Sequence, residues 1–183
     1  MNKKALIIVD YNKDFVAADG KLTCGKPGQD IDDNIAKIVE EFSKNGDFIF
    51  NTCDNHTEDD IYNPEHRMFP AHCICGTSGR ELYGNTGKAV SKVKPEQLIQ
   101  IEKWRLSAFA GTNLDIKLRE REIRDIYLVG VCSDICVMHT AIDAYNLGYN
   151  IYVYKNGIAS FNSEGHAFAL NHFENTLGAT IVN

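Results

Sequence analysis

The sequence lacks long apolar runs. No stretch of its 183 residues approaches the roughly 20 consecutive apolar residues that a membrane-spanning helix needs. The five apolar residues ALIIV, which follow Lys3 and Lys4, are too few for the apolar region of a secretory signal peptide. We therefore expect a soluble, cytoplasmic protein that does not bind a membrane.

Basic clusters are also missing. The chain has 19 Lys and Arg residues against 25 Asp and Glu residues, which gives a formal net charge of −6 at pH 7. A net negative charge repels nucleic-acid phosphates and anionic lipids. The composition therefore argues against a nucleic-acid partner and favours a small molecule.

Linkers, internal repeats and low-complexity segments are absent, and only four prolines occur. A chain of this length can bury roughly 70% of the surface that it exposes when unfolded, which is enough for a full core of sheet and helices. We therefore expect one domain over residues 1–183. The sequence leaves the oligomeric state open, a homo-oligomer included.

The six cysteines do not indicate a disulfide framework, because a chain of this size without an export signal rarely contains one. Cys73 and Cys75 are too close together for the C-x₂-C spacing of a zinc knuckle. Most of the cysteines are expected to be small buried apolar residues.

Apolar runs alternate with helical patterns along the chain, which is typical of a doubly wound α/β fold. The run at 5–9 is continuous, as expected of a parallel strand that is covered on both faces. Helical spacing follows up to residue 44, and Gly46 ends that helix. The other expected elements are strands at 48–50, 126–131, 151–154 and 179–182, two weaker strands around 89–93 and 98–103, helices at 134–147 and 163–177, and a helix that runs from a capping box at Thr112 and Asp115 to about Glu122.

These elements predict a three-layer α/β/α sandwich with a mostly parallel, six-stranded sheet. Residues 54–88 show no clear periodicity, and a loop of that length in a compact domain is usually functional. Asp10, Asp54 and Cys136 each stand at or just beyond the carboxyl end of a strand. Open α/β sheets bind their ligands at this edge, so we expect the site there.

Cys136 is the candidate nucleophile. It lies in the first turn of an expected helix, where the helix dipole lowers the pKa of a thiol and free N–H groups can bind an oxyanion. A buried structural cysteine would give the same local pattern.

An activating base is needed beside that thiol. His139 is poorly placed for this role, because it lies on the same short turn. Asp10 follows a fully apolar strand and is the better candidate, although a turn residue would also fit there. Lys103 is either a solvated lysine or, if it points inward, a cation that holds Asp10 and Cys136 ionised and close together.

A second group of polar residues could bind a metal ion. Asp54 and His56 are alternate residues of an extended segment, so their side chains share one face. Glu65, His66 and His72 follow in the long loop. A carboxylate with two imidazoles suits zinc, iron(II) or manganese and leaves positions open for water or substrate. Solvated loop side chains are the alternative.

Together these motifs resemble the nicotinamidase branch of the isochorismatase-like cysteine hydrolases. The resemblance extends over nearly the whole chain, from LIIVDYNKDF at the start to FENTLGA near the end. It is strongest in NTCDNH, in FPAHCICGTSGREL, in KWRLSAFAGTNLDIKLRE and in LVGVCSDICVMHTAIDAYNLGY.

The resemblance implies roles for particular residues. The family's catalytic Asp, Lys and Cys correspond to Asp10, Lys103 and Cys136. A cis peptide bond between Val131 and Cys132 would direct the N–H groups of Cys132 and Cys136 toward the oxyanion.

The resemblance also implies one bound divalent ion, zinc before iron or manganese. Its ligands correspond to Asp54, His56, Glu65 and His72, with His66 as the rival of Glu65.

The substrate implied by the resemblance is nicotinamide, which would be hydrolysed to nicotinic acid and ammonia through a cysteine thioester, a step of NAD salvage. Phe15 and Phe69 would contact the pyridine ring, and Leu106 stands where an aromatic residue is expected. The metal would bind the ring nitrogen. The alternatives are a relative that acts on a different small amide and a non-catalytic metal-binding module on the same fold.

Overall fold

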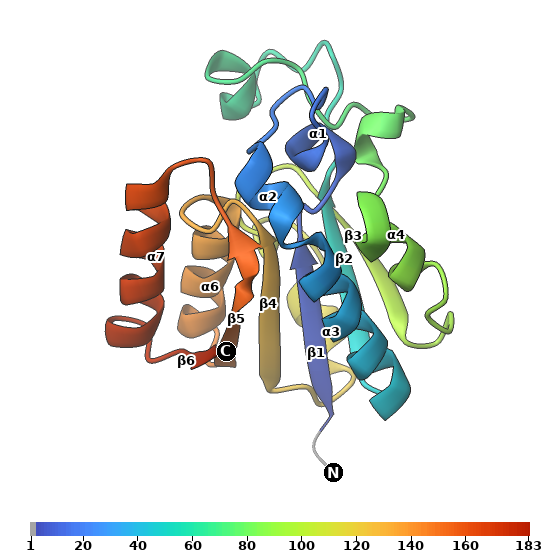
Figure 1. Cartoon of the computed structure of the whole chain (residues 1–183), viewed down its shortest axis with the longest axis vertical. Helices are drawn as coiled ribbons and strands as arrows, with labels where there is room; N and C mark the ends of the chain where they lie inside the picture. Colours follow the sequence, from blue (N-terminus) through green and yellow to red (C-terminus); the bar gives the residue numbers. More distant parts are fainter. Residues whose placement is uncertain (1–2) are drawn as a thin grey trace.

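The computed structural model describes residues 3–183 (Figure 1). At its centre is a six-stranded, all-parallel sheet in the order β3-β2-β1-β4-β5-β6, which confirms the predicted fold class. The chain reverses its direction of winding between β1 and β4, as in other doubly wound sheets. The strands are Lys4–Val9 (β1), Phe48–Asp54 (β2), Leu98–Lys103 (β3), Asp125–Val131 (β4), Asn150–Ala159 (β5) and Thr180–Val182 (β6).

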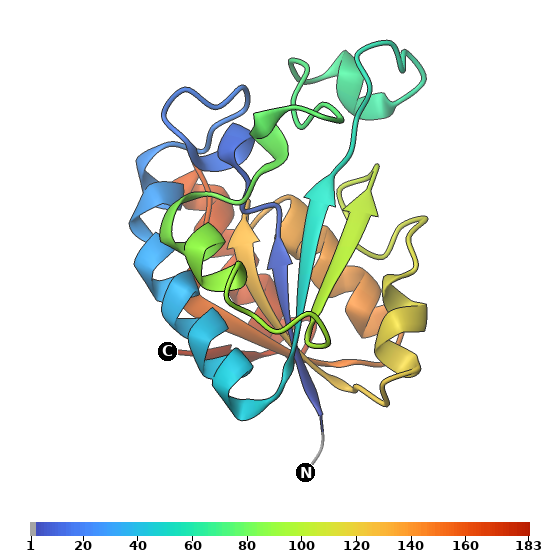
Figure 2. The same ribbon diagram turned by 90° about the vertical axis from the view of Figure 1, so that its right-hand side faces the viewer.

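Helices cover both faces of the sheet, with α3 on one side and α6 on the other (Figure 2). Within residues 3–183, no helix combines the length and the apolar character that crossing a membrane requires. The α-helices are Lys13–Val16 (α1), Lys26–Asp30 (α2), Asp32–Asn45 (α3), Gly84–Val90 (α4), Leu114–Arg119 (α5), Cys136–Asn146 (α6) and Ser163–Asn175 (α7), and two short 3₁₀ helices are Pro64–Arg67 (η1) and Ser78–Arg80 (η2).

The position of strand β1 between two helical layers explains why its sequence is apolar without alternation. Its odd-numbered residues, such as Ile7, face the core formed with α5, α6 and α7. Its even-numbered residues, such as Leu6 and Ile8, face the core formed with α1, α3 and α4. Because alternate side chains of a strand point to opposite faces, a strand between two helical layers must be apolar at every position.

The expected strand around residues 89–93 is wrong, because Ala89 and Val90 belong to helix α4. The carboxylate of Asp32 caps the start of this helix by accepting the N–H groups of Asn85 at 2.7 Å and of Thr86 at 2.9 Å. This cap comes from more than 50 residues away in the sequence, so local patterns give no sign of it.

The expected capping box at Thr112 and Asp115 is only half present, because the Thr112 hydroxyl accepts the N–H of Leu114 at 3.2 Å but Asp115 does not bond back to Thr112. Helix α5 begins after Asn113, and the Asp115 carboxylate binds Arg119 and the Tyr149 hydroxyl. The helix ends at Arg119 rather than near Glu122, which has a left-handed φ of 58°.

Candidate active site

The carboxyl ends of four neighbouring strands, β3, β2, β1 and β4, bring the predicted catalytic residues together. Asp10 directly follows β1, and Lys103 is the last residue of β3. Asp54 ends β2 between them and is paired in register with Lys103. Cys136 begins α6, just after β4. The segments around these residues lie above the carboxyl edge of the sheet, at the top of Figure 1.

The Lys103 ammonium is at the centre of this group. Its side chain is fully buried, and Nζ lies 2.7 Å from Asp10 Oδ2 and 2.6 Å from Asp54 Oδ1. The same nitrogen is 4.0 Å from Cys136 Sγ and donates to the carbonyl of Arg105 at 3.1 Å. Burial lowers the pKa of Lys103, but the charges of Asp10 and Asp54 outweigh it and raise that pKa well above its ordinary value. Lys103 is therefore a permanent cation.

Asp10 has the properties of a proton acceptor at neutral pH. Burial and the neighbouring Asp54 charge raise the pKa of Asp10 to about 7, although Lys103 and Cys136 act in the opposite direction. A carboxyl group with this pKa exists in both protonation states near neutrality, as a group that accepts and later donates a proton must.

The Cys136 thiol is buried, and burial raises its pKa well above the ordinary value, despite the opposing charge of Lys103. The predicted effect of the helix start is therefore not enough to ionise this thiol by itself. Ionisation requires a base within reach, and Asp10 is the candidate, since its carboxylate and the thiol meet at the same ammonium. His139 does not line the cavity, and it is exposed, with Nδ1 bonded to the Ile135 carbonyl.

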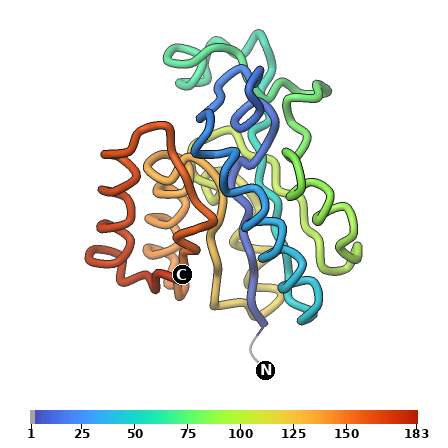
Figure 3. Tube along the Cα trace, viewed as in Figure 1, coloured from blue at the N-terminus to red at the C-terminus, as the bar shows by residue number. Residues whose placement is uncertain are grey.

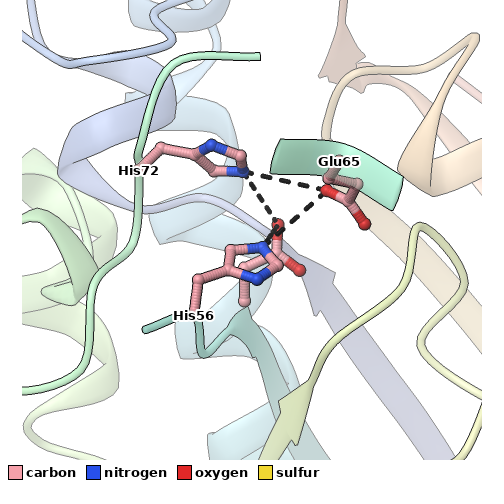
Figure 4. Close-up of side chains that lie close together, drawn as sticks. His56, Glu65 and His72 are labelled. Carbon is pink, nitrogen blue, oxygen red and sulfur yellow. Dashed lines mark ion pairs between the residues drawn. The ribbon is translucent and has the colours of Figure 1, made fainter. Parts of the chain in front are cut away.

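The predicted metal ligands lie together beside this group. Asp54, His56, Glu65 and His72 are all buried, and each offers one ligand atom within 4.8 Å of the others. Asp54 Oδ2 is 3.6 Å from His56 Nε2 and 3.7 Å from His72 Nε2, and Glu65 Oε2 is 3.8 Å from each of these nitrogens. Figure 4 shows the side chains of His56, Glu65 and His72 turned toward a common point.

These four residues fit a divalent ion. Four atoms placed tetrahedrally about 2.1 Å from zinc are separated by about 3.4 Å, close to the observed spacing. Within residues 3–183, Asp54 Oδ2 and the two Nε2 atoms are buried without a hydrogen-bond partner, and a bound cation would satisfy all three. The Nδ1 atom of His72 is bound to the Pro70 carbonyl at 2.8 Å, which leaves its Nε2 free to bind a metal. The cluster includes Glu65 and not its rival His66.

A cavity of about 250 Å³ connects the two groups. Cys136, Asp54, Glu65 and His72 all contribute to its wall, so a bound molecule would contact the thiol and the metal cluster together. The remaining wall is mostly apolar and consists of Phe15, Leu22, Thr23, Phe69, Leu106, Val131, Cys132, Ile135 and Phe161.

All three predicted substrate-contacting residues, Phe15, Phe69 and Leu106, line this cavity. Sequence reasoning missed Phe161, which supplies a further aromatic side chain from the loop after β5. No local signal marks this residue, since an exposed aromatic residue between a strand and a helix has no distinctive pattern.

The turn before Cys136 has the predicted cis peptide bond between Val131 and Cys132. The Cys132 carbonyl accepts the N–H groups of Ile135 and Val137, each at 3.1 Å, which closes the turn around the start of α6. At a helix start, the first N–H groups have no partner within the helix. Cys136 is the first residue of α6, so its N–H is one of these, and the residue itself lines the cavity.

Comparison with known proteins gives consistent matches over the whole chain. A family model for the isochorismatase domain matches residues 4–183. An uncharacterized isochorismatase family protein of Bacillus subtilis, PncA, is 54% identical over 98% of this chain and 99% of its own length. The solved pyrazinamidase/nicotinamidase of Streptococcus mutans is 52% identical, with a TM-score of 0.96 over 98% of this chain and 100% of its own. The pyrazinamidase of Pyrococcus horikoshii, solved in complex with zinc, is 28% identical, with a TM-score of 0.85 over 99% of both chains.

Proposed function

The chain belongs to the isochorismatase family, and from that premise we propose that it is a nicotinamidase, which hydrolyses nicotinamide to nicotinic acid and ammonia. One observation carries the proposal: the wall of a single cavity contains the Cys136 thiol together with Asp54, Glu65 and His72. The similar protein of Streptococcus mutans is named for this activity.

The cavity suits a flat aromatic amide. Phe15 and Phe69 provide aromatic surface, and Leu106 and Ile135 add aliphatic surface. Apolar walls with few polar groups are typical of sites that bind and orient small ring compounds. The carboxamide would then lie at the Cys136 end of the cavity, and the ring nitrogen would face the metal cluster.

The first chemical step is attack by sulfur. Asp10 accepts the proton of the Cys136 thiol, while the Lys103 cation stabilises both the carboxylate and the forming thiolate. The thiolate attacks the carboxamide carbon, and the electron pair of the C=O bond moves to oxygen. The N–H groups of Cys132 and Cys136 donate hydrogen bonds to this oxyanion.

Collapse of the tetrahedral species completes the first half of the reaction. The C–N bond breaks, Asp10 returns its proton to the departing nitrogen, and ammonia leaves. The acyl group remains on Cys136 as a thioester. Asp10 then accepts a proton from a water molecule that attacks the thioester carbon. The C–S bond breaks with its electron pair going to sulfur, Asp10 returns its proton to sulfur, and nicotinic acid leaves.

A divalent ion, zinc by preference, would be held by Asp54, His56, Glu65 and His72. When bound, such an ion supplies Lewis acidity and a coordination position for the ring nitrogen of the substrate. The two carboxylates and two imidazoles would hold this ion in the wall of the cavity that also contains the Cys136 thiol.

Release of ammonia from nicotinamide tests the proposal directly. The purified protein should release one ammonia for each nicotinic acid formed, and a chelator should suppress the reaction until zinc is restored. Absence of ammonia release from the zinc-loaded protein would refute the proposed activity. Turnover that is unchanged after complete removal of metal would refute its metal dependence alone.

A further inference from the structure

Asp14 has a buried carboxylate that belongs neither to the proton-transfer group, which consists of Asp10, Lys103 and Cys136, nor to the metal cluster. It lies in α1 and is only 9% exposed. Its Oδ2 accepts the N–H of Cys73 at 2.7 Å, and its Oδ1 accepts the N–H of Lys21 at 3.4 Å. Burying a carboxylate is costly unless it is hydrogen-bonded, so these backbone contacts account for its presence. The carboxylate therefore connects two separate segments of the chain.

The segment around Cys73 contains one metal ligand, His72, and is hydrogen-bonded to a second, His56. Cys73 directly follows His72 and has a left-handed φ of 45°, which is unusual for a residue other than glycine. The Cys73 carbonyl accepts the N–H of His56 at 3.2 Å, and the His56 carbonyl accepts the N–H of Cys75 at 2.8 Å. The position of the Cys73 backbone therefore affects both histidines.

The other segment forms part of the cavity wall. The Asp14 carbonyl accepts the N–H of Leu22 at 3.0 Å, and Leu22 lines the cavity. The neighbouring Phe15 also lines the cavity and places its ring edge-on to the ring of His72, with 5.2 Å between ring centres. Figure 3 shows both parts of the trace above the carboxyl edge of the sheet, in blue for the segment around Asp14 and in teal to green for the loop that contains Cys73.

We propose that Asp14 is a positioning residue that holds the histidine ligands and the apolar wall of the cavity in one fixed arrangement. It contacts no reacting atom, and its carboxylate acts through the N–H of Cys73 on one side and on the other through the N–H of Lys21, the neighbour of Leu22. The part of this role that concerns substrate rests on the proposed nicotinamidase function. The part that concerns the metal cluster does not.

Three variants test the contact between the Asp14 carboxylate and the Cys73 N–H, two by changing Asp14 itself and one by changing its neighbour Gly79. Asp14→Ala removes both acceptor oxygens, whereas Asp14→Asn keeps one oxygen that can accept the Cys73 N–H. Gly79→Ala leaves Asp14 in place, but the added methyl group would overlap the Asp14 carboxylate and displace it. Asp19→Asn is the matched control, since Asp19 is exposed and lies in the same part of the chain.

The first measurement is zinc affinity, obtained by competition with a chromophoric chelator. Substitution of residues that orient metal ligands typically weakens metal binding by about ten- to a hundredfold. We expect a loss in this range for Asp14→Ala and for Gly79→Ala, a smaller loss for Asp14→Asn, and no change for Asp19→Asn. The second measurement is nicotinamide turnover at saturating zinc, where KM should rise in Asp14→Ala while kcat stays close to that of the parent.

Several results would overturn this role for Asp14. These are equal zinc affinities for Asp14→Ala and Asp19→Asn, an Asp14→Asn variant no better than Asp14→Ala, and a parent protein that does not bind zinc. If Asp14→Ala does not fold, Gly79→Ala and Asp14→Asn carry the same test. If no protein, the parent included, releases ammonia from nicotinamide, the proposed function fails, and the zinc affinities still decide the role of Asp14.

Discussion

Asp54 and Lys103 are paired across strands β2 and β3, and their charged groups meet at 2.6 Å. The two carboxylate oxygens of Asp54 have different partners. Oδ1 binds the Lys103 ammonium, and Oδ2 faces His56 and His72. Despite burial, which raises it, the pKa of Asp54 is held well below its ordinary value by Lys103 and these histidines. One carboxylate therefore joins the proton-transfer group to the metal cluster.

Asp54→Asn should therefore affect both groups. The variant should lose most of its bound metal, because one of few protein ligands loses its charge. It should also lower the pKa of Asp10, since the Asp54 charge is one cause of its elevation. The pH dependence of Cys136 alkylation by iodoacetamide, measured on metal-free proteins, reports this second effect. An alkylation midpoint that is the same in variant and parent would show that the two carboxylates are not coupled.

The pKa of Asp10 predicts the acidic limb of the pH profile. Asp10 must be ionised to accept the thiol proton, and its pKa is raised to about 7. The value of kcat/KM should therefore fall as the pH decreases through about 7 and reach a plateau above it. Asp10→Asn should lower kcat/KM by roughly 10²- to 10⁴-fold, the usual contribution of a general base. A parent profile with its midpoint near 4, the ordinary range of an aspartate, would contradict the assignment.

Cys136→Ala should lower ammonia release by at least about a thousandfold while the protein stays folded, because alanine is smaller than cysteine and removes the nucleophile. His139→Ala is the control on the same helix. It should stay close to the parent, since His139 is exposed and bonded to the Ile135 carbonyl. Comparable losses in both variants would instead support a Cys–His pair.

Metal analysis distinguishes the third ligand from its neighbour. His72→Ala and Glu65→Ala should each release bound metal, because both side chains belong to the buried cluster. His66→Ala should keep it, since His66 lies outside that cluster. Retention of metal by Glu65→Ala together with its loss from His66→Ala would reverse the choice between them.

The fold and the location of the site were predictable because their signals are local. The continuous apolar run of β1 requires helices on both faces, and Asp10, Asp54 and Cys136 mark the carboxyl edge of the sheet. The resemblance of short motifs then assigned individual ligands, and the structure brings Asp54, His56, Glu65 and His72 together.

What could not be predicted depends on contacts between distant segments. The Asp32 cap of helix α4 explains why residues 89–93 do not form a strand. The raised pKa of the Cys136 thiol depends on how deeply the thiol is buried, and a helix-start pattern does not reveal burial. The place of Phe161 in the cavity wall likewise depends on how the loop after β5 folds over the site.

Comparison of benzamide with nicotinamide separates a metal-assisted nicotinamidase from a general amidase. Benzamide has nearly the same shape and should enter the apolar walls formed by Phe15 and Phe69, but it has no ring nitrogen to meet the metal cluster. Loss of that contact and of its electron withdrawal should cost about 3 kcal/mol, which is roughly a hundredfold in kcat/KM. Steady-state ammonia release from the zinc-loaded protein measures the ratio, and benzamide should still inhibit nicotinamide turnover competitively. Equal kcat/KM values for the two amides would mean that the cavity recognises only the carboxamide and the shape of the ring. That result would remove the ring nitrogen from the proposed mechanism and leave the chemistry of Asp10, Lys103 and Cys136 unaffected.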